Sequence, residues 1–424
     1  MKPIELAKTL YPINRSLTGE GVRMSLNILK DSLEEIEVKE YKCGEKCFDW
    51  QIPPEWNIKE GWIQSMNGEN IVDLAQNNLH VMGYSIPINQ TISREELLKH
   101  VHTSKENENA IPYVTSYYNR DWGFCLTDIQ KKVLIDEFYK VYIDSELNAN
   151  GVLNYGEAVI RGRTKQEVLI STYICHPSMA NNEISGPVVA TYIGQWLKSL
   201  KKRNYTYRLL FLPETIGSIA YISKNLKRMK RNIKAGFVLT CIGDEKNYSY
   251  LQSRKGNTLS DRAAQLALQT IDRKYKKYGW NERGSDERQY CAPGVDLPIC
   301  SIMRTKYNEY PEYHTSLDNF NIVTEEGLQG GIQAVKQTLT IIERNIKPRC
   351  RIICEPQLGK RGLYPTKSDK KNYNDVQDIL NIISYCDGKN DTIDIANKCK
   401  IPFTDVIDYI DRMIDEGIVE KKRF

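Results

Sequence analysis

Residues 167–177 read EVLISTYICHP, a largely apolar run that ends in Cys175, His176 and Pro177. A run that is apolar nearly throughout, rather than alternating, is typical of a central strand in a sheet covered on both faces. Similar runs are YRLLFL (207–212), AGFVLTCI (235–242) and LPICSIM (297–303), and helical patterns intervene at 187–200, 218–230, 259–278 and 324–344. This alternation predicts an α/β fold with a doubly wound, mostly parallel sheet.

Length and charge set limits on the class of protein. With 424 residues the chain exceeds what one hydrophobic core usually supports, so two or three domains are expected. A net charge of +5, from 59 basic and 54 acidic residues, is too small to indicate a polyanionic partner by itself. The N-terminus lacks the apolar core of a signal peptide, and no stretch approaches the roughly 18 apolar residues of a membrane span. The eleven cysteines are therefore expected to be reduced thiols of a cytoplasmic protein that has no membrane partner.

Composition divides the chain into three parts. Residues 1–43 and 153–346 carry the α/β pattern and are expected to form one discontinuous domain. Residues 44–152 have prolines, tryptophans and short aromatic runs between turn residues, which predicts an inserted β-rich domain. We expect this insert to gate the site or to form a homo-oligomer or partner contact, and a purely stabilising module is the alternative. Residues 371–424, after a polar linker at 355–370, follow the order of a winged helix-turn-helix domain, with three helices and then a hairpin stub.

The third helix of that C-terminal module is strongly acidic. DNA affinity depends chiefly on Lys and Arg side chains that neutralise phosphates. Against a single basic residue, Arg412, this helix carries Asp405, Asp408, Asp411, Asp415 and Glu416. We therefore expect no nucleic-acid partner and instead packing of this module on the enzyme body or on a protein partner.

Polar side chains with metal-binding chemistry follow three of the predicted strands. His176 follows 167–174, Glu214 follows 207–212, and His314 lies in the loop after 297–303. Because ligand sites of doubly wound sheets form outside the carboxyl ends of the strands, these groups are expected to converge. Each alone has an ordinary structural role, such as a hydrogen-bonded histidine or a glutamate that caps a helix. Two imidazoles and a carboxylate together suit zinc, so the pattern favours a metal hydrolase.

Four segments, in order, are CHPSMANNEISG, LPETIGS, GSDERQY and PEYHTSLDN. Their order resembles the signature segments of the co-catalytic zinc aminopeptidases, a clan that also contains glutaminyl cyclases and glutamate carboxypeptidases. The chain is most similar to a bacterial branch of that clan with a β-rich insert and a C-terminal winged helix. The resemblance covers 1–43 and 153–346, and it implies a zinc-aminopeptidase type of sheet.

The resemblance also implies a ligand set. His176 and His314 match the two metal-ligand histidines, and Asn182 stands in the place of an aspartate that bridges two zinc ions. Glu214 matches a pair of glutamates, one a general base and the other a ligand. Thr240 lies where the clan has another ligand aspartate. Because Asn182 and Thr240 are neutral, we expect one tightly held zinc and a doubtful second site.

Three further residues are candidates for the site, two of them through the resemblance. Asp286, in GSDERQY, matches a catalytic aspartate, and Glu287 replaces a histidine and is expected to bind substrate. Either Glu214 is the general base, or it is a zinc ligand and Asp286 carries the proton. Arg15, in NRSLTGEG, is expected to bind a substrate carboxylate, with a surface arginine near a helix start as the alternative.

The function that follows is zinc-dependent hydrolysis of an amide in a small peptide or peptide-like conjugate, as in an aminopeptidase. Two alternatives stay open. The chain could be a catalytically degenerate binding protein, coupled to the winged helix as a regulator. It could also use the same one-zinc site for glutaminyl cyclisation or ester hydrolysis.

Overall fold

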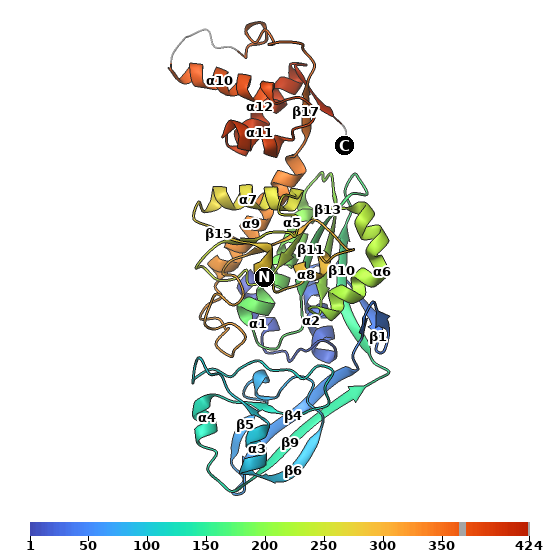
Figure 1. The fold of residues 1–424 in the computed structure, drawn as a ribbon, viewed down its shortest axis with the longest axis vertical. Helices are drawn as coiled ribbons and strands as arrows, with labels where there is room; N and C mark the ends of the chain where they lie inside the picture. The colour runs from blue at the N-terminus through green and yellow to red at the C-terminus, as the bar shows by residue number, and fades with distance from the viewer. Residues whose placement is uncertain (364–369, 423–424) are drawn as a thin grey trace. The chain divides into compact units, whose positions relative to one another are not determined.

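The computed structural model describes residues 1–363 and 370–422 (Figure 1). The contacts divide the chain into two compact units, residues 1–264 with 268–336, and residues 265–267 with 337–424. Part of the predicted linker, 364–369, and the last two residues of the predicted winged helix, 423–424, lie outside the described residues. In the part of the chain that is described, no helix is long and apolar enough to cross a membrane.

The first unit contains an eight-stranded mixed sheet (Figure 1). In spatial order its strands are β1 (Glu37–Lys42), β10 (Val152–Ile160), β12 (Thr206–Leu212), β11 (Glu167–Tyr173), β13 (Ile233–Leu239), β16 (Ile299–Met303), β14 (Ser249–Leu251) and β15 (Lys276–Tyr278). The four central strands, β12, β11, β13 and β16, run parallel to one another. The predicted α/β class, with a parallel sheet built from the four apolar runs, is confirmed.

Helices cover both faces of this sheet. On one face α5 (Ser185–Ser199) packs on β10 to β13, beside α1 (Pro3–Leu10) and α2 (Glu20–Ser32), and on the other α6 (Ile216–Asn232) packs against α8 (Glu287–Tyr290). Strand β12 shows why its sequence is apolar throughout: Leu209 packs against α5 at Gly194, whereas Leu210 and Leu212 join a core cluster with α6. Two more helices, α7 (Leu259–Ile271) and α9 (Glu325–Arg344), complete the α/β pattern.

The helix predicted at 259–278 is too long. It ends at Ile271, and the residues that follow it form β15, which pairs with β14 in parallel. The segment Lys276–Tyr278 has no apolar alternation of its own, so only its partner strand reveals it as a strand.

The insert is a β-rich layer, as predicted. Its four-stranded antiparallel sheet has the order β5 (Asn70–Asp73), β4 (Glu55–Ser65), β9 (Phe138–Asn148) and β6 (Ile88–Ser93). Smaller elements are the hairpin β2 (Lys46–Cys47) and β3 (Trp50–Gln51), the pair β7 (Val101–His102) and β8 (Phe124–Cys125), and helices α3 (Arg94–Lys99) and α4 (Asp128–Lys132). Short 3₁₀ turns occur at Asn78–His80, Trp280–Glu282 and Gly359–Arg361. The insert belongs to the same compact unit as the α/β body.

The C-terminal unit contains the three predicted helices, α10 (Lys370–Ser384), α11 (Thr392–Cys399) and α12 (Phe403–Asp415). Their apolar faces share one core that includes Ile379, Ile395 and Ile410. The predicted terminal hairpin is wrong. Strand β18 (Val419–Lys422) pairs with β17 (Lys347–Cys350), which precedes all three helices, and a local pattern cannot reveal such a distant partner.

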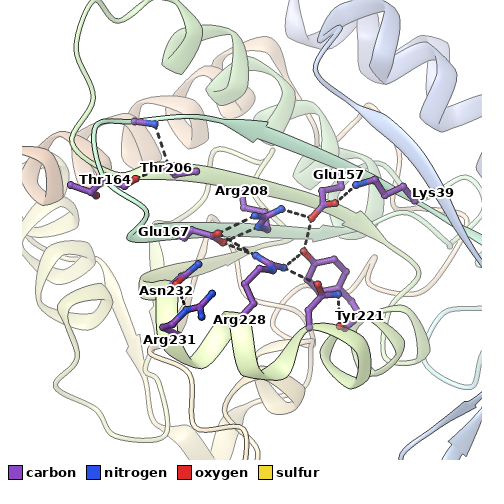
Figure 2. Close-up of polar contacts among 12 residues, drawn as sticks. Lys39, Glu157, Thr164, Glu167, Thr206, Arg208, Tyr221, Arg228, Arg231 and Asn232 are labelled. Carbon is purple, nitrogen blue, oxygen red and sulfur yellow. Dashed lines mark hydrogen bonds and ion pairs between the residues drawn. The ribbon is translucent and has the colours of Figure 1, made fainter.

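A buried ionic network ties the sheet to α6 at the amino ends of β11 and β12 (Figure 2). The Arg208 guanidinium of β12 lies between Glu157 of β10 and Glu167 of β11, with 2.8 and 2.9 Å hydrogen bonds to the two oxygens of Glu167. Arg228 of α6 donates to the same carboxylate at 2.9 Å and to the Tyr221 hydroxyl. Each buried carboxylate therefore has cationic partners that offset the cost of its desolvation.

We expect Arg208→Met to lower the free energy of unfolding by about 2 kcal/mol, because it leaves two buried carboxylates short of a partner. The loss stays below that of an isolated buried pair, since Lys39 and Arg228 remain in contact with Glu157 and Glu167. Urea unfolding of Arg208→Met beside Arg163→Met, an exposed arginine before β11, measures the difference. An equal effect of both variants would contradict a stabilising network.

Candidate active site

The carboxyl ends of the central strands bring together side chains that are distant in sequence. His176 follows β11, Glu214 follows β12, Asp286 precedes α8, and His314 lies in the loop after β16. The His176 Nε2 atom is 3.8 Å from Glu214 Oε2, and the rings of His176 and His314 have centroids 5.4 Å apart. The structure therefore places these residues at one edge of the sheet, as ligands of a shared ion would need to be.

Glu183 occupies the other side of the His176 ring, a position that the sequence analysis missed. One of its carboxylate oxygens, Oε2, lies 2.8 Å from His176 Nδ1, and the other accepts the backbone N–H of Cys175. When Glu183 is ionised, Nδ1 carries the proton and the Nε2 lone pair faces Glu214. Histidines that bind metals almost always donate their second N–H in this way.

A π-helical turn, η2 (Ala180–Ile184), delivers Glu183 to this position. The turn is fixed by the Asp318 carboxylate, which accepts the backbone N–H groups of Asn181 at 2.6 Å and Asn182 at 2.9 Å. Such wide turns are frequent at functional sites. The acid of the NNEISG segment is thus brought beside His176, although the motif alignment pointed to Asn182.

Asn182 instead belongs to a neutral hydrogen-bonded group. Its Oδ1 accepts the Tyr173 hydroxyl at 3.1 Å, and that hydroxyl also contacts Thr240 Oγ1. Thr240 Oγ1 donates to the Asn182 carbonyl at 3.0 Å. All three residues are buried, so a tyrosine and two neutral side chains fill the place where the resemblance expects two aspartates.

Glu214, which is partly buried, and Asp286, which is fully buried, are two carboxyl groups whose ionised forms are disfavoured. Burial and the neighbouring Asp286 raise the pKa of Glu214 to about 8, and burial raises the pKa of Asp286 to about 6. Asp286 Oδ1 accepts the Thr215 N–H at 2.8 Å and the Ser218 hydroxyl at 2.9 Å. Asp286 Oδ2 is buried and has no hydrogen-bond partner among the described residues. Two crowded carboxyl groups of this kind favour a cation between or beside them.

The histidines have the opposite response. Burial lowers the pKa of His176 and of His314 to about 3, so both imidazoles are neutral at physiological pH. Neutral imidazole is the form that binds metal ions. The residues present therefore fit a zinc ion in their chemistry, with nitrogen donors on two sides and a carboxylate on a third.

Arg15 is not a surface arginine. It is 2% exposed, and its guanidinium donates to the backbone carbonyls of His176 at 3.2 Å and Leu10 at 2.6 Å. Its Nη2 atom is buried and has no hydrogen-bond partner among the described residues. Arg15 therefore supports the backbone of the His176 loop from beneath the site.

Glu287 lies deeper than a substrate-binding group normally does. It is fully buried, and its carboxylate accepts hydrogen bonds from the N–H groups of Gly284 and Ser285, the Ser301 hydroxyl and the Tyr307 hydroxyl. The side chain thus organises the loop that carries Asp286.

Two family profiles match the sequence of this chain. The profile of a domain of unknown function, DUF4910, matches residues 4–345. The chain belongs to the DUF4910 family. A winged helix-turn-helix profile matches residues 344–421, so the C-terminal module predicted from the sequence is confirmed.

The relatives of this DUF4910 protein agree with the fold. A Clostridium acetobutylicum protein, named for polysaccharide biosynthesis with an aminopeptidase-like domain, is 41% identical over 404 residues, 94% of this chain and 91% of the relative. A crystal structure of a protein from the same organism, named as a peptidase, has a TM-score of 0.92 at 38% identity and covers 99% of this chain and 96% of its own. A zinc aminopeptidase from Bacillus subtilis has a TM-score of 0.58 at 12% identity, over 80% and 94% of the two chains. The aminopeptidase-like fold is therefore confirmed.

Two donor sets meet at His176 in the DUF4910 chain. The Nδ1 side has Glu183 and Cys175, whose Sγ lies 3.3 Å from Nδ1. Nε2 faces Glu214, and the His314 ring lies 5.4 Å from the His176 ring. Burial raises the pKa of the Cys175 thiol well above its usual value, so it remains protonated, whereas zinc binds thiolate. Two ligand atoms on one tetrahedral zinc are about 3.3 Å apart. Nδ1 and Glu183 Oε2, at 2.8 Å, are already joined by a hydrogen bond, whereas Nε2 and Glu214 Oε2, at 3.8 Å, leave room for an ion between them. The Nε2 side is the better zinc site.

Metal-free protein should lose stability as the pH rises from 6.5 to about 8. The folded-state pKa of Glu183 and of Glu214 is raised to about 8, so the stability that these groups contribute is complete below their ordinary value of 4.5 and is lost as the pH rises through 8. The histidines, whose pKa is lowered, contribute constant stability above 6.5. We expect a decrease of about 3 kcal/mol, from two carboxyl groups together, in urea unfolding with a chelator present.

The matched variant Glu214→Gln should show a flatter dependence over the same pH range, because the amide cannot ionise. An unchanged slope in this variant would mean that Glu214 is not desolvated.

Proposed function

We propose that this DUF4910 protein is a zinc-dependent amide hydrolase, an aminopeptidase-like enzyme for peptide-like substrates. The observation that carries the proposal is the convergence of His176 Nε2, Glu214 and His314 beside a second carboxyl group, Asp286. Two neutral imidazoles and one carboxylate form the usual protein ligand set of a catalytic zinc, which leaves a fourth position for water or substrate.

We assign one zinc, held by His176, His314 and Glu214. The neutral group of Tyr173, Asn182 and Thr240 supports a single ion, because two ions about 3.5–4 Å apart need anionic ligands between them. When bound, the ion supplies Lewis acidity that polarises the scissile carbonyl and acidifies a nearby water.

The protein residues then divide the remaining work. Asp286 offers Oδ2 as a proton acceptor, since its Oδ1 is already held by Thr215 and Ser218. Its pKa, raised to about 6, is close to the operating pH that suits a general base. Glu183 orients the His176 ring, and Arg15 holds the backbone carbonyl of the same residue.

The substrate class is the least specified part of the proposal. The fold supports an amide of a peptide or a peptide-like conjugate. The name of the Clostridium relative adds amides on amino sugars, because it refers to polysaccharide biosynthesis. A panel of aminoacyl anilides, dipeptides and N-acyl amino sugars, assayed with zinc-loaded full-length protein, separates these possibilities and includes glutamine cyclisation and simple esters as alternatives.

A second function, substrate binding without catalysis, is favoured by one observation. The neutral Tyr173, Asn182 and Thr240 group replaces acids on which the two-metal chemistry of the resembled clan depends. The winged helix would then transmit binding to a partner. Its α12 carries acidic residues, one of which, Asp411, pairs with Arg344 at 2.7 Å, so we propose a protein rather than nucleic acid as that partner.

The zinc site has a direct test. Elemental analysis of metal-replete protein should give about one zinc per chain, and His314→Ala should remove most of it because a nitrogen ligand is lost. His100→Ala, which removes a histidine stacked on Trp122 in the insert, and Cys175→Ala should both retain zinc. Loss of zinc in Cys175→Ala but not in His314→Ala would place the ion on the Nδ1 side of His176.

Two conservative variants separate ligand from base. Asp286→Asn should keep its zinc and lose turnover by about a hundredfold or more, because it removes the proton acceptor. Glu214→Gln should lose both zinc affinity and turnover, since an amide oxygen is a weaker ligand. If Glu214→Gln keeps its zinc and only turnover falls, the two roles are reversed. Full activity in both variants on the best substrate would contradict the enzyme proposal.

A further inference from the structure

His314 has a backbone conformation that needs outside support. Its φ angle is +55°, in the left-handed region that residues other than glycine rarely adopt. Such a conformation persists only where the surrounding structure determines it strongly. The loop that carries His314 has no regular secondary structure of its own between Met303 and Glu325.

The support comes from the insert. The Tyr113 N–H donates to the His314 carbonyl at 2.9 Å, and Pro112 forms an antiparallel bridge with Thr315. Ile111 completes the pairing: its carbonyl accepts the Ser316 N–H at 2.9 Å, and its N–H donates to Ser316 Oγ at 3.0 Å. A short extended segment of the insert thus pairs with 314–316 and fixes the backbone at the histidine and the two residues after it.

The Tyr113 side chain contacts both candidate ligands. Its ring centroid lies 4.9 Å from that of His176 and 5.4 Å from that of His314, in a tilted and an edge-to-face arrangement. Tyr313 also stacks on the His314 ring at 3.9 Å, so the imidazole contacts two tyrosine rings. The angle at which each histidine presents its nitrogen therefore depends on the packing of Tyr113.

The insert also contacts the loop after His176. Met179 packs in a buried cluster with Leu79, Ile111 and Cys125 of the insert. Asn78 Nδ2 donates to Ser178 Oγ at 2.7 Å. Both histidine loops are thus braced by the same inserted domain, which argues for a fixed part of the site rather than a movable lid.

We infer that Tyr113 is a positioning residue and that the insert is an obligatory component of the metal site. The ring sets the distance and angle between His176 and His314, and the Ile111–Tyr113 backbone holds His314 in its left-handed conformation. This inference rests on the proposed function, because it assigns a role toward the ion that the two histidines would bind.

Cobalt(II) titration of the chelator-stripped full-length protein tests the inference without an activity assay, because the visible absorption of the bound ion reports its coordination geometry. We expect Tyr113→Ala to weaken cobalt binding about tenfold or more and to alter the spectrum, as the loss of a group that orients a ligand does. Tyr113→Phe keeps the ring and should restore the affinity and spectrum of the unmodified protein. Tyr142→Ala is the matched control, since it removes a ring of the insert that stacks on Trp62 at 5.2 Å instead of on a candidate ligand.

Each outcome decides one question. Equal cobalt affinity and spectrum in Tyr113→Ala and the unmodified protein would overturn the inference, as would an equal loss in Tyr142→Ala. Failure of the unmodified protein to bind cobalt or zinc would instead contradict the proposed function. If Tyr113→Ala does not fold, Ser316→Ala replaces it: removal of the acceptor for the Ile111 N–H should weaken cobalt binding several-fold, and an unchanged affinity would overturn the role of the backbone pairing.

Discussion

A carboxylate and an imidazole, both almost fully buried, face each other where the central strand of the sheet ends. Burying Glu183 and His176 separately would be costly, because each would leave polar atoms without partners. In contact, the two side chains form a hydrogen bond with each other. The π-helical turn that makes this contact possible is itself fixed by Asp318. The direction of His176 Nε2, and hence the location of the candidate site, follows from this pair.

Charge is distributed differently at the two ends of the same strands. At the amino ends, arginines from β12 and α6 accompany the buried carboxylates, and the network is complete within the protein. At the carboxyl ends, burial disfavours the ionised forms of Glu214 and Asp286, and the two neighbouring groups repel each other when both are ionised. The pKa of each is therefore raised. Groups with perturbed pKa values cluster at functional sites, because a bound cation or substrate supplies the partner that the protein itself does not provide.

Replacement of acids by Tyr173, Asn182 and Thr240 changes the chemistry that the fold can support. In the resembled clan, carboxylates hold two ions; here a neutral hydrogen-bonded group fills part of that space. Glu183 adds an acid on the far side of His176 instead. The fold is thus retained while neutral side chains replace acids, an arrangement that supports the proposed single ion.

The amino-acid sequence determined the sheet, because fully apolar runs are stable only as strands covered on both faces. It also determined that His176, Glu214 and His314 would meet, because the carboxyl ends of parallel strands share one edge. Only the tertiary structure decided that Glu183 and Tyr113 lie beside the histidines and that β17 pairs with β18. Ile111 and Ser316, for example, are 205 positions apart. The Ser316 N–H donates to the Ile111 carbonyl, a backbone hydrogen bond that any sequence can form, so no residue pattern records the pairing. The π-helical turn could not be predicted from the sequence either. It depends on Asp318, which only the folded chain brings to Asn181 and Asn182.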